Sequence, residues 1–189
     1  MATAVVGAVV LGVSLRVEPG STWFYPATLG LAAVWTVGAL ASGPVPWGRA
    51  TSGSLAAGLG LAGVFVAGAL VVREIDALER QVSRVLDFAD QGSIPILVVV
   101  TVVNGVAEEM FFRGAAYDAI ARHPVAWTTV AYVAATAATG NIMLSFAAVV
   151  LGLVVGLQRR ASGGILAPIV THVSWSLSML FALPLLFGA

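Results

Sequence analysis

Long runs of apolar residues dominate this chain of 189 residues, and they constrain its fold more than any other feature. Hydrophobic residues make up 59% of the sequence and charged residues only 10%, a balance typical of a protein that lies mostly in lipid. Inside a bilayer every backbone N–H and C=O group must be hydrogen-bonded within the protein, so apolar runs of about 20 residues form helices. The sequence therefore predicts an all-α, polytopic membrane bundle.

About seven segments are apolar enough to be predicted transmembrane helices. They lie at about Ala2–Val17, Phe24–Ala41, Ser54–Val72, Ser93–Arg113, Pro124–Thr139, Ile142–Leu157 and Gly164–Gly188. The segment Ser42–Gly53 contains two prolines and is predicted to be a loop. We divide the chain into N-terminal spans with an interfacial helix (1–92) and a core (93–189), both within one integrated membrane domain.

The segment Arg73–Asp90 differs from the spans, because its apolar residues recur at steps of three and four with charged residues between them. This pattern predicts one amphipathic helix lying at the membrane surface. The helix either shapes an entrance for a substrate or simply connects two spans.

A second short-range pattern, Gly152 and Gly156, is a pair of small residues four positions apart, which lets two helix backbones approach closely. The partner is either a helix of the same chain or a second copy of the protein.

Two features of the composition exclude whole classes of function. The chain has no cysteine, which excludes disulfides, thiolate metal sites and a cysteine nucleophile. The formal net charge is +0, and no basic patch predicts a nucleic-acid partner.

An acidic pair and an arginine end the fourth apolar segment, in the string Glu108-Glu109-Met110-Phe111-Phe112-Arg113. Charged groups at bilayer depth are costly, so they need a partner or a function. Glu109 and Arg113 are four residues apart and share one helix face, where they can pair. Glu108 is rotated by about 100° from Glu109 and points away from Arg113. Because Arg113 does not neutralise it, Glu108 is the candidate general base. Alternatively, these charges mark a helix end and extend to water.

His172 lies deep in the last apolar segment, with apolar residues on both sides. A polar group at that depth needs a partner inside the bundle, and Ser176 shares its helix face one turn further on. His172 is either catalytic or joins two helices through hydrogen bonds. His123, beside Pro124, is predicted to lie in an exposed loop.

No cofactor is firmly implied, and a divalent metal ion stays open. Glu108, Glu109 and His172 offer three ligand groups, but zinc usually takes more nitrogen or sulfur, and the chain lacks His-Glu-x-x-His. Asp118 lies too near a loop to favour a Ser/His/Asp triad.

Three motifs follow one another in the C-terminal half of the chain. They read Glu-Glu-x-x-x-Arg (Glu108–Arg113), Gly-Leu-x-x-Gly-Leu (Gly152–Leu157) and Ala-Pro-x-x-x-His (Ala167–His172). In this order they resemble the CPBP intramembrane proteases, the family of the CAAX prenyl proteases and bacteriocin-processing (Abi-like) proteins. The resemblance covers roughly Ser93–Leu183, about half of the chain.

The resemblance implies roles for these residues. Glu108 is expected to activate a water, Glu109 and Arg113 to form a supporting pair, and His172 to stabilise an oxyanion.

The chain departs from the family pattern at two positions. In the Phe-x-x-x-His motif, which falls on Tyr132–Thr136, Thr136 replaces histidine. In the His-x-x-x-Asn motif Ser176 replaces asparagine. Serine still donates a hydrogen bond, whereas Thr136 cannot accept a proton as histidine does and is expected only to help place a water.

The residues and the resemblance together predict an intramembrane endopeptidase in a bacterial-type plasma membrane. Its partners are the lipid bilayer and a membrane-associated peptide or protein substrate. The alternative is a catalytically impaired relative that binds peptides as an immunity or scaffold protein. A third hypothesis is a proton-coupled carrier, because buried Glu and His also form proton relays.

Overall fold

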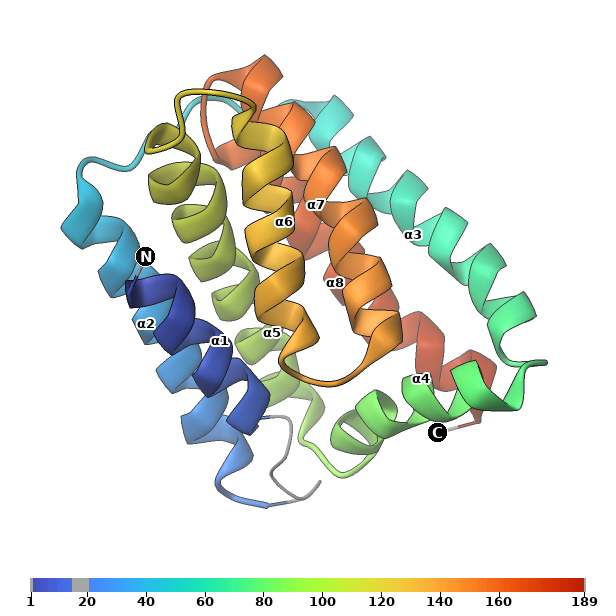
Figure 1. Cartoon of the computed structure of the whole chain (residues 1–189). Coiled ribbons are helices and arrows are strands. Elements are labelled where there is room, and N and C mark those ends of the chain that lie inside the picture. Colours follow the sequence, from blue (N-terminus) through green and yellow to red (C-terminus); the bar gives the residue numbers. More distant parts are fainter. Residues whose placement is uncertain (1, 15–20, 189) are drawn as a thin grey trace.

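The computed structural model describes residues 2–14 and 21–188, and within these ranges the chain forms helices and no strand (Figure 1). The helices are α1 (Ala2–Ser14), α2 (Phe24–Ser42), α3 (Ser52–Val72), α4 (Asp76–Asp90), α5 (Ile94–Glu109), the π-helix η1 (Met110–Ala116), α6 (Pro124–Ala137), α7 (Ile142–Ser162) and α8 (Leu166–Phe187). The predicted all-α fold is confirmed, and the predicted loop after α2 is present.

The number of helices that can cross a membrane is smaller than predicted. In the described ranges five are long and apolar enough: α2, α3, α5 continued by η1, α7 and α8. The predicted spans at α1 and α6 are helical but have only 13 and 14 residues, fewer than the ~20 needed to cross the hydrocarbon. The count of seven is therefore not confirmed, and residues 15–17 of the first predicted span lie outside the described residues.

Local sequence explains why α6 is short. His123 has a φ of 55°, and Pro124 follows at the first helical position, where its missing N–H costs nothing. At the other end Gly140 has a φ of 73°, a conformation that glycine adopts readily. Asn141 then caps α7, accepting hydrogen bonds from the N–H groups of Met143 and Leu144.

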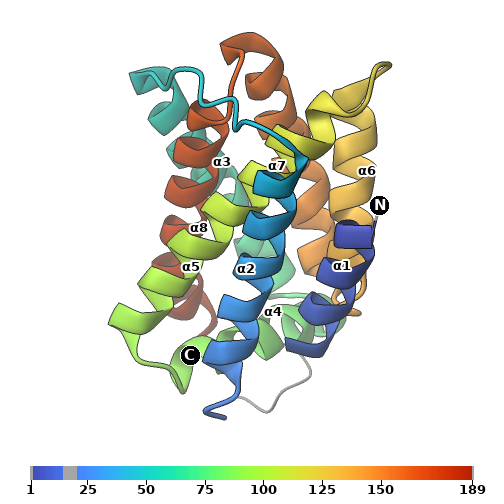
Figure 2. The same ribbon diagram turned by 90° about the vertical axis from the view of Figure 1, so that its left-hand side faces the viewer.

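The helices pack around α5 and α8, which contact each other in the middle of the bundle. On one side α2 lies between α1 and α5, as Figure 2 shows. On the other side α8 contacts α3 and α7, and α6 packs along α7. This arrangement brings the C-terminal half of α5, η1, α6, α7 and α8 around one interior region.

An aromatic cluster holds η1 between α2 and α6. Trp35 of α2 packs against Phe111 and Phe112, with ring centroids 4.9 Å and 5.0 Å apart, and Phe112 meets Tyr132 of α6 at 5.1 Å. Trp35 and Phe112 are each only 1% exposed. Buried aromatic pairs of this kind stabilise a fold beyond the apolar area that they bury, and this cluster fixes where η1 lies.

Close helix contacts depend on glycines at defined positions. The glycine pair of α7 faces α6: a Cβ atom at Gly152 would lie 3.0 Å from Cγ2 of Thr129, and one at Gly156 would lie 3.0 Å from Cγ1 of Val125. The pair therefore packs inside the protein, which is the first of the two alternatives that its spacing allows.

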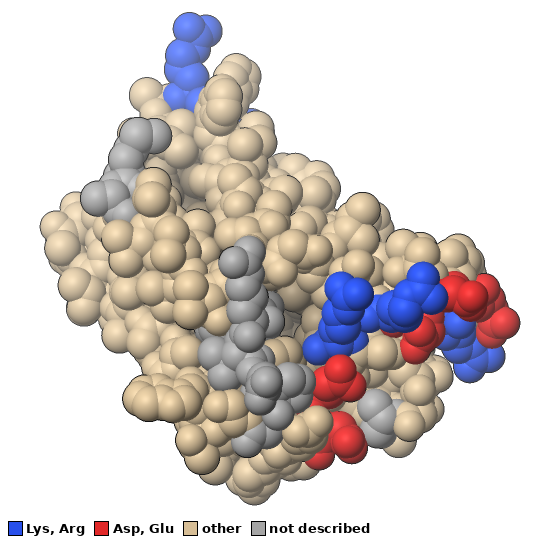
Figure 3. Space-filling view, turned by 60° about the horizontal axis from the view of Figure 1, so that its bottom comes forward, with Lys and Arg blue, Asp and Glu red and all other residues tan. Residues whose placement is uncertain are grey.

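The amphipathic helix predicted within Arg73–Asp90 is present as α4, which begins at Asp76 and lies across one end of the bundle. Figure 3 shows charged side chains gathered on this end of the molecule. The exposed charged residues here are Arg73, Glu74, Asp76, Arg80, Arg84, Asp87 and Asp90. Leu86, on the opposite face of α4, is buried, so the helix has one charged and one apolar side.

The contact between α3 and α8 gives a first prediction. A Cβ atom at Gly58 would collide with Oγ of Ser174 and lie 2.7 Å from the backbone oxygen of Thr171. We expect Gly58→Ala to lower the free energy of unfolding in detergent by about 1–3 kcal/mol, because the helices must separate. Gly60→Ala is the matched control, since a Cβ atom there meets nothing within 4 Å; equal stability of both variants would contradict the packing.

Candidate active site

Glu108 and Glu109 end α5, Arg113 follows in η1, and His172 faces them from α8. The two helices approach closely at Gly105, where a Cβ atom would lie 3.4 Å from Cγ2 of Val173 and 3.8 Å from Cδ2 of His172. A Cβ atom at this position would be in ordinary van der Waals contact with both residues of α8. The structure thus brings together all four residues predicted to be catalytic, although the sequence separates His172 from the others.

Glu109 is the centre of this group. One of its oxygens, Oε1, accepts hydrogen bonds from Nη1 of Arg113 at 3.2 Å and from Nδ1 of His172 at 2.8 Å. The side chains of Glu109 and Arg113 are both 0% exposed. The i,i+4 pairing predicted from the sequence therefore forms, and it is joined by a histidine that no spacing rule connects to it.

Arg113 holds the same group from the other side. Its Nη2 donates to the backbone oxygen of Gly152 at 3.4 Å, and its guanidinium carbon lies 4.7 Å from the ring centroid of Tyr132. A Cβ atom at Gly152 would lie 3.4 Å from that Nη2, so a residue with a side chain at 152 would crowd the arginine. The Gly-Leu-x-x-Gly-Leu motif thus contributes a backbone acceptor for Arg113 and the space that its side chain occupies.

The bond to Glu109 also sets the state of the His172 ring. A carboxylate only accepts hydrogen bonds, so Nδ1 of His172 carries a proton. The other ring nitrogen, Nε2, faces Glu108, whose Oε2 lies 3.9 Å away. Glu109 therefore orients the imidazole, and Nε2 is left for chemistry with Glu108, the arrangement in which a third group orients a base.

The charges balance when Glu108 and His172 share one proton. The negative charge of Glu109 and the positive charge of Arg113 cancel within one contact. With one proton shared by Glu108 and Nε2 of His172, in addition to the proton on Nδ1, the four side chains together carry no net charge, which is the favourable state in an apolar bundle. Such a pair can take a proton from one group and pass it to another.

The two residues predicted to support the site do not join this cluster. The hydroxyl of Thr136 donates to the backbone oxygen of Tyr132 at 3.0 Å, one turn back along α6. Ser176 lies one turn beyond His172 and lines a cavity. Within the described part of the chain, no hydrogen bond links either hydroxyl to Glu108, Glu109, Arg113 or His172.

Sequence reasoning missed Tyr132. Its ring centroid lies 6.5 Å from that of His172, and its hydroxyl interacts with the carboxyl group of Glu108. The available signal was its position one turn before Thr136 on the same face of α6, together with the phenol hydroxyl that a phenylalanine lacks.

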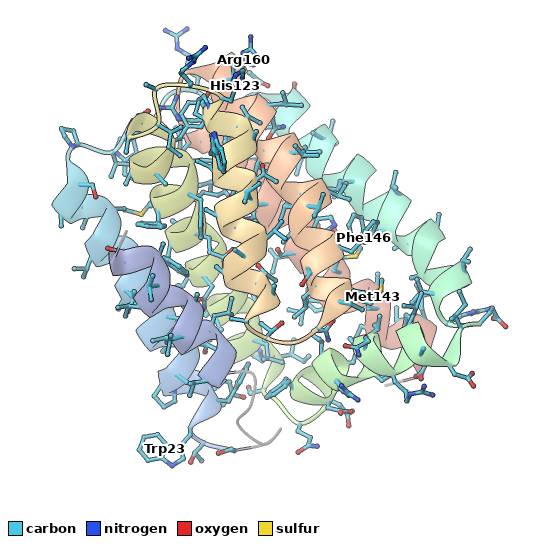
Figure 4. All side chains as sticks on the ribbon, viewed as in Figure 1. Trp23, His123, Met143, Phe146 and Arg160 are labelled. Atoms are coloured by element: carbon cyan, nitrogen blue, oxygen red, sulfur yellow. The ribbon has the colours of Figure 1, made fainter. Side chains whose placement is uncertain are left out.

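Arg159 lies in a helix that is longer than predicted. The predicted span Ile142–Leu157 is present as α7, which continues to Ser162. Arg159 is buried and donates from Nε to the backbone oxygen of Arg113 at 2.7 Å and from Nη2 to Oδ1 of Asp118 at 2.7 Å. Arg160 is exposed, and Figure 4 shows it at the same end of the molecule as His123, which is exposed as predicted, and opposite Trp23.

The π-helix η1 was also not predicted, because the segment up to Arg113 was expected to be an ordinary helix. Hydrogen bonding in a π-helix spans five residues, and such turns occur frequently at functional sites. Here η1 begins directly after Glu109, and the backbone oxygen of Arg113 accepts from Arg159 of α7. This hydrogen bond joins η1, which continues α5, to α7 next to the charged cluster.

The open question of a metal ion has a partial structural answer. Among the side chains that the structure describes, no group of three His, Cys, Asp or Glu is arranged to hold a metal ion. Oε1 of Glu109 is occupied by Arg113 and His172. The other oxygen of Glu109, Oε2, is buried and has no hydrogen-bond partner among the described residues.

An apolar cavity of about 480 Å³ lies next to the cluster, between α3, α4, α7 and α8. Phe146 and Met143 of α7 line it, and Figure 4 shows both on the side of α7 that faces α3. Trp175 connects it to the site, because it lines the cavity and its ring lies 6.3 Å from that of His172. The helix α4 forms one wall of the cavity through Val82, Val85 and Leu86. This agrees with the interpretation that the helix shapes an entrance for a substrate.

Comparison with known proteins finds a family similar to the region that contains the cluster. A family model described as type II CAAX prenyl endopeptidase Rce1-like matches residues 90–178. This region is therefore similar to the CPBP/CAAX protease family. The resemblance inferred from the motifs is confirmed, and all four clustered residues lie within the match. No curated protein and no solved structure matches the chain. A membrane protease family and the long apolar helices together indicate an integral membrane protein.

The buried arginine of α7 gives the second prediction. We expect Arg159→Ala to lower the free energy of unfolding by about 1.5–3 kcal/mol, because it removes charged hydrogen bonds and leaves the Arg113 carbonyl without its partner. Thermal unfolding in detergent measures this loss. Arg160→Ala removes an exposed neighbour of the same type and should change stability by less than about 0.5 kcal/mol; if it matched Arg159→Ala, the tie between α7 and η1 would be refuted.

Proposed function

We propose that this protein is an intramembrane endopeptidase of the CPBP/CAAX type, in which Glu108 activates a water that attacks a peptide bond near the membrane surface. The observation that carries the proposal is the pair formed by Glu108 and Nε2 of His172, 3.9 Å apart beside an apolar cavity. The family match supports a protease in general terms; the residue roles are those that the resemblance implies, and the geometry is compatible with them.

The distance within the pair suits one shared oxygen atom. A water that contacts Oε2 of Glu108 and Nε2 of His172 at about 2.8 Å each fits a separation of 3.9 Å. Glu108 takes one proton from this water as the new C–O bond to the peptide carbonyl forms. His172, protonated while Glu108 is a carboxylate, donates from Nε2 to the developing oxyanion. The proton held by Glu108 then passes to the leaving amine as the C–N bond breaks.

Glu109 and Arg113 support this chemistry without taking part in it. The hydrogen bond from His172 Nδ1 to Glu109 keeps the ring oriented, and Arg113 compensates the Glu109 charge. Because both side chains are fully buried, neither can contact a substrate.

The cavity suits a substrate that arrives from the lipid. Its wall is almost entirely apolar, and the few polar side chains in it include Ser176 and Thr101. A membrane-associated peptide can place an apolar portion there while its scissile bond reaches the Glu108–His172 pair past Trp175. This fits the predicted partners, a membrane-associated peptide or protein and the bilayer, and we place the protein in a bacterial-type plasma membrane.

A second candidate function follows from Thr136. Its hydroxyl is bound to the backbone of its own helix, so nothing at this position performs the proton transfer expected of the family histidine. The same fold then serves as a peptide-binding immunity or scaffold protein with impaired catalysis. Cleavage that is absent in the wild type and gained in Thr136→His would favour this second function.

The catalytic proposal predicts the behaviour of two variants. We expect purified wild-type protein in detergent to cleave members of a membrane-peptide library, and Glu108→Gln and His172→Ala to reduce kcat by at least about 100-fold, since each removes a group that moves or stabilises charge in the transition state. Mass spectrometry of the products measures both.

Glu74→Gln is the matched control, because Glu74 is exposed and its carboxylate bonds to the exposed side chain of Arg73. Cleavage by Glu108→Gln at the wild-type rate would refute the role of Glu108.

The cavity wall gives a further prediction for the substrate. Ser176→Ala should raise KM by about 3- to 10-fold with little change in kcat, because its hydroxyl lines the cavity as a hydrogen-bonding group for the peptide. Ser178→Ala is the comparison, since the Ser178 hydroxyl donates to the backbone oxygen of Ser174 within α8. A rise in KM of the same size in both variants would remove the assigned role of Ser176.

A further inference from the structure

Tyr132 lies where three charged or titratable side chains of the cluster meet. It is 8% exposed, and its hydroxyl interacts with the carboxyl group of Glu108. Its ring lies 4.7 Å from the guanidinium carbon of Arg113 and 6.5 Å from the ring of His172. Neither the stabilising pair nor the proton-sharing pair described above uses this hydroxyl.

The ring of Tyr132 is held from two sides, which fixes the position of its hydroxyl. Phe112 packs against it edge-on at 5.1 Å, and the Arg113 guanidinium covers it, a favourable cation–π contact in a desolvated site. Arg113 is in turn fixed by Glu109 and by the carbonyl of Gly152. A hydroxyl on a ring held in this way can orient the group that it bonds.

Glu108 needs such an orienting group. A carboxylate has two oxygens and rotates freely about its last bond unless a donor fixes it. Oε2 faces His172 at 3.9 Å, too far for a hydrogen bond, so His172 does not fix it. The hydroxyl of Thr136, also on α6, donates instead to the backbone oxygen of Tyr132.

We propose that Tyr132 is the positioning residue of Glu108, donating a hydrogen bond from its hydroxyl that keeps Oε2 turned toward His172. The catalytic consequence of this contact rests on the proposed function, but the contact itself does not. Tyr132 acts through Glu108 and does not exchange a proton with the substrate. In this chain Glu108 thus receives a polar partner from α6 through Tyr132 and not through Thr136.

The test uses Tyr132→Phe, which removes one oxygen and keeps the ring against Phe112 and Arg113. Infrared spectra of purified protein, with the Glu108 band assigned by its loss in Glu108→Gln, report hydrogen bonding to that carboxyl group directly. We expect Tyr132→Phe to shift the Glu108 band, and to cause no shift in the same region when it is introduced into Glu108→Gln.

Tyr117→Phe is the matched control. Tyr117 also lies beside an arginine, with the guanidinium carbon of Arg159 4.8 Å from its ring, but it is outside the cluster. This variant should leave the Glu108 band unchanged. An unshifted band in Tyr132→Phe, or an equal shift in Tyr117→Phe, would overturn the proposal.

Kinetics separate this proposal from the proposed function. If the wild type cleaves peptides, Tyr132→Phe should lower kcat by about 10- to 100-fold with little change in KM, since a misplaced catalytic group loses rate rather than affinity. Unchanged kcat would overturn the positioning role. If the wild type cleaves nothing and the band still shifts, the contact stands and the proposed function fails.

Discussion

A carboxylate with no exposed surface, Glu109, is the constraint on which the rest of this structure depends. An isolated charge in such a place costs several kcal/mol or more, so its position requires partners. Arg113 and His172 both bond to the same oxygen of Glu109. Once Glu109 and Arg113 compensate each other, His172 is oriented and Glu108 is left as the carboxylate that can react.

The same constraint organises the helices. Arg113 reaches the carbonyl of Gly152, and its own carbonyl accepts from Arg159, so α7 is joined twice to η1. Gly105 permits the approach of α8 that brings His172 to Glu109. The glycines here work as spaces for polar contacts, not as flexible points in the chain. The apolar cavity lies beside this group of contacts, between α3, α4, α7 and α8.

Much of this could be predicted from local sequence patterns. Apolar run length gave the helical class, and the four-residue spacing of Glu109 and Arg113 gave their pairing. The partners of Tyr132 and Arg159 lie on other helices, and periodicity along one helix contains no information about such contacts. The π-helix and the shortness of α6 depend on hydrogen bonds and turn geometry, which hydropathy does not report. Motif alignment placed Thr136 in the site but could not predict its contact, because its hydroxyl donates to the backbone of its own helix.

The most direct test of this account is a double-mutant cycle on Glu109 and Arg113, which needs no substrate. Unfolding free energies in detergent are measured for Glu109→Gln, Arg113→Met and the double variant. The account predicts that each single change costs about 3–5 kcal/mol by leaving an uncompensated buried charge, and that the double variant loses clearly less than the sum. Losses that add to within about 0.5 kcal/mol would show that the two charges do not depend on each other, which would contradict the account.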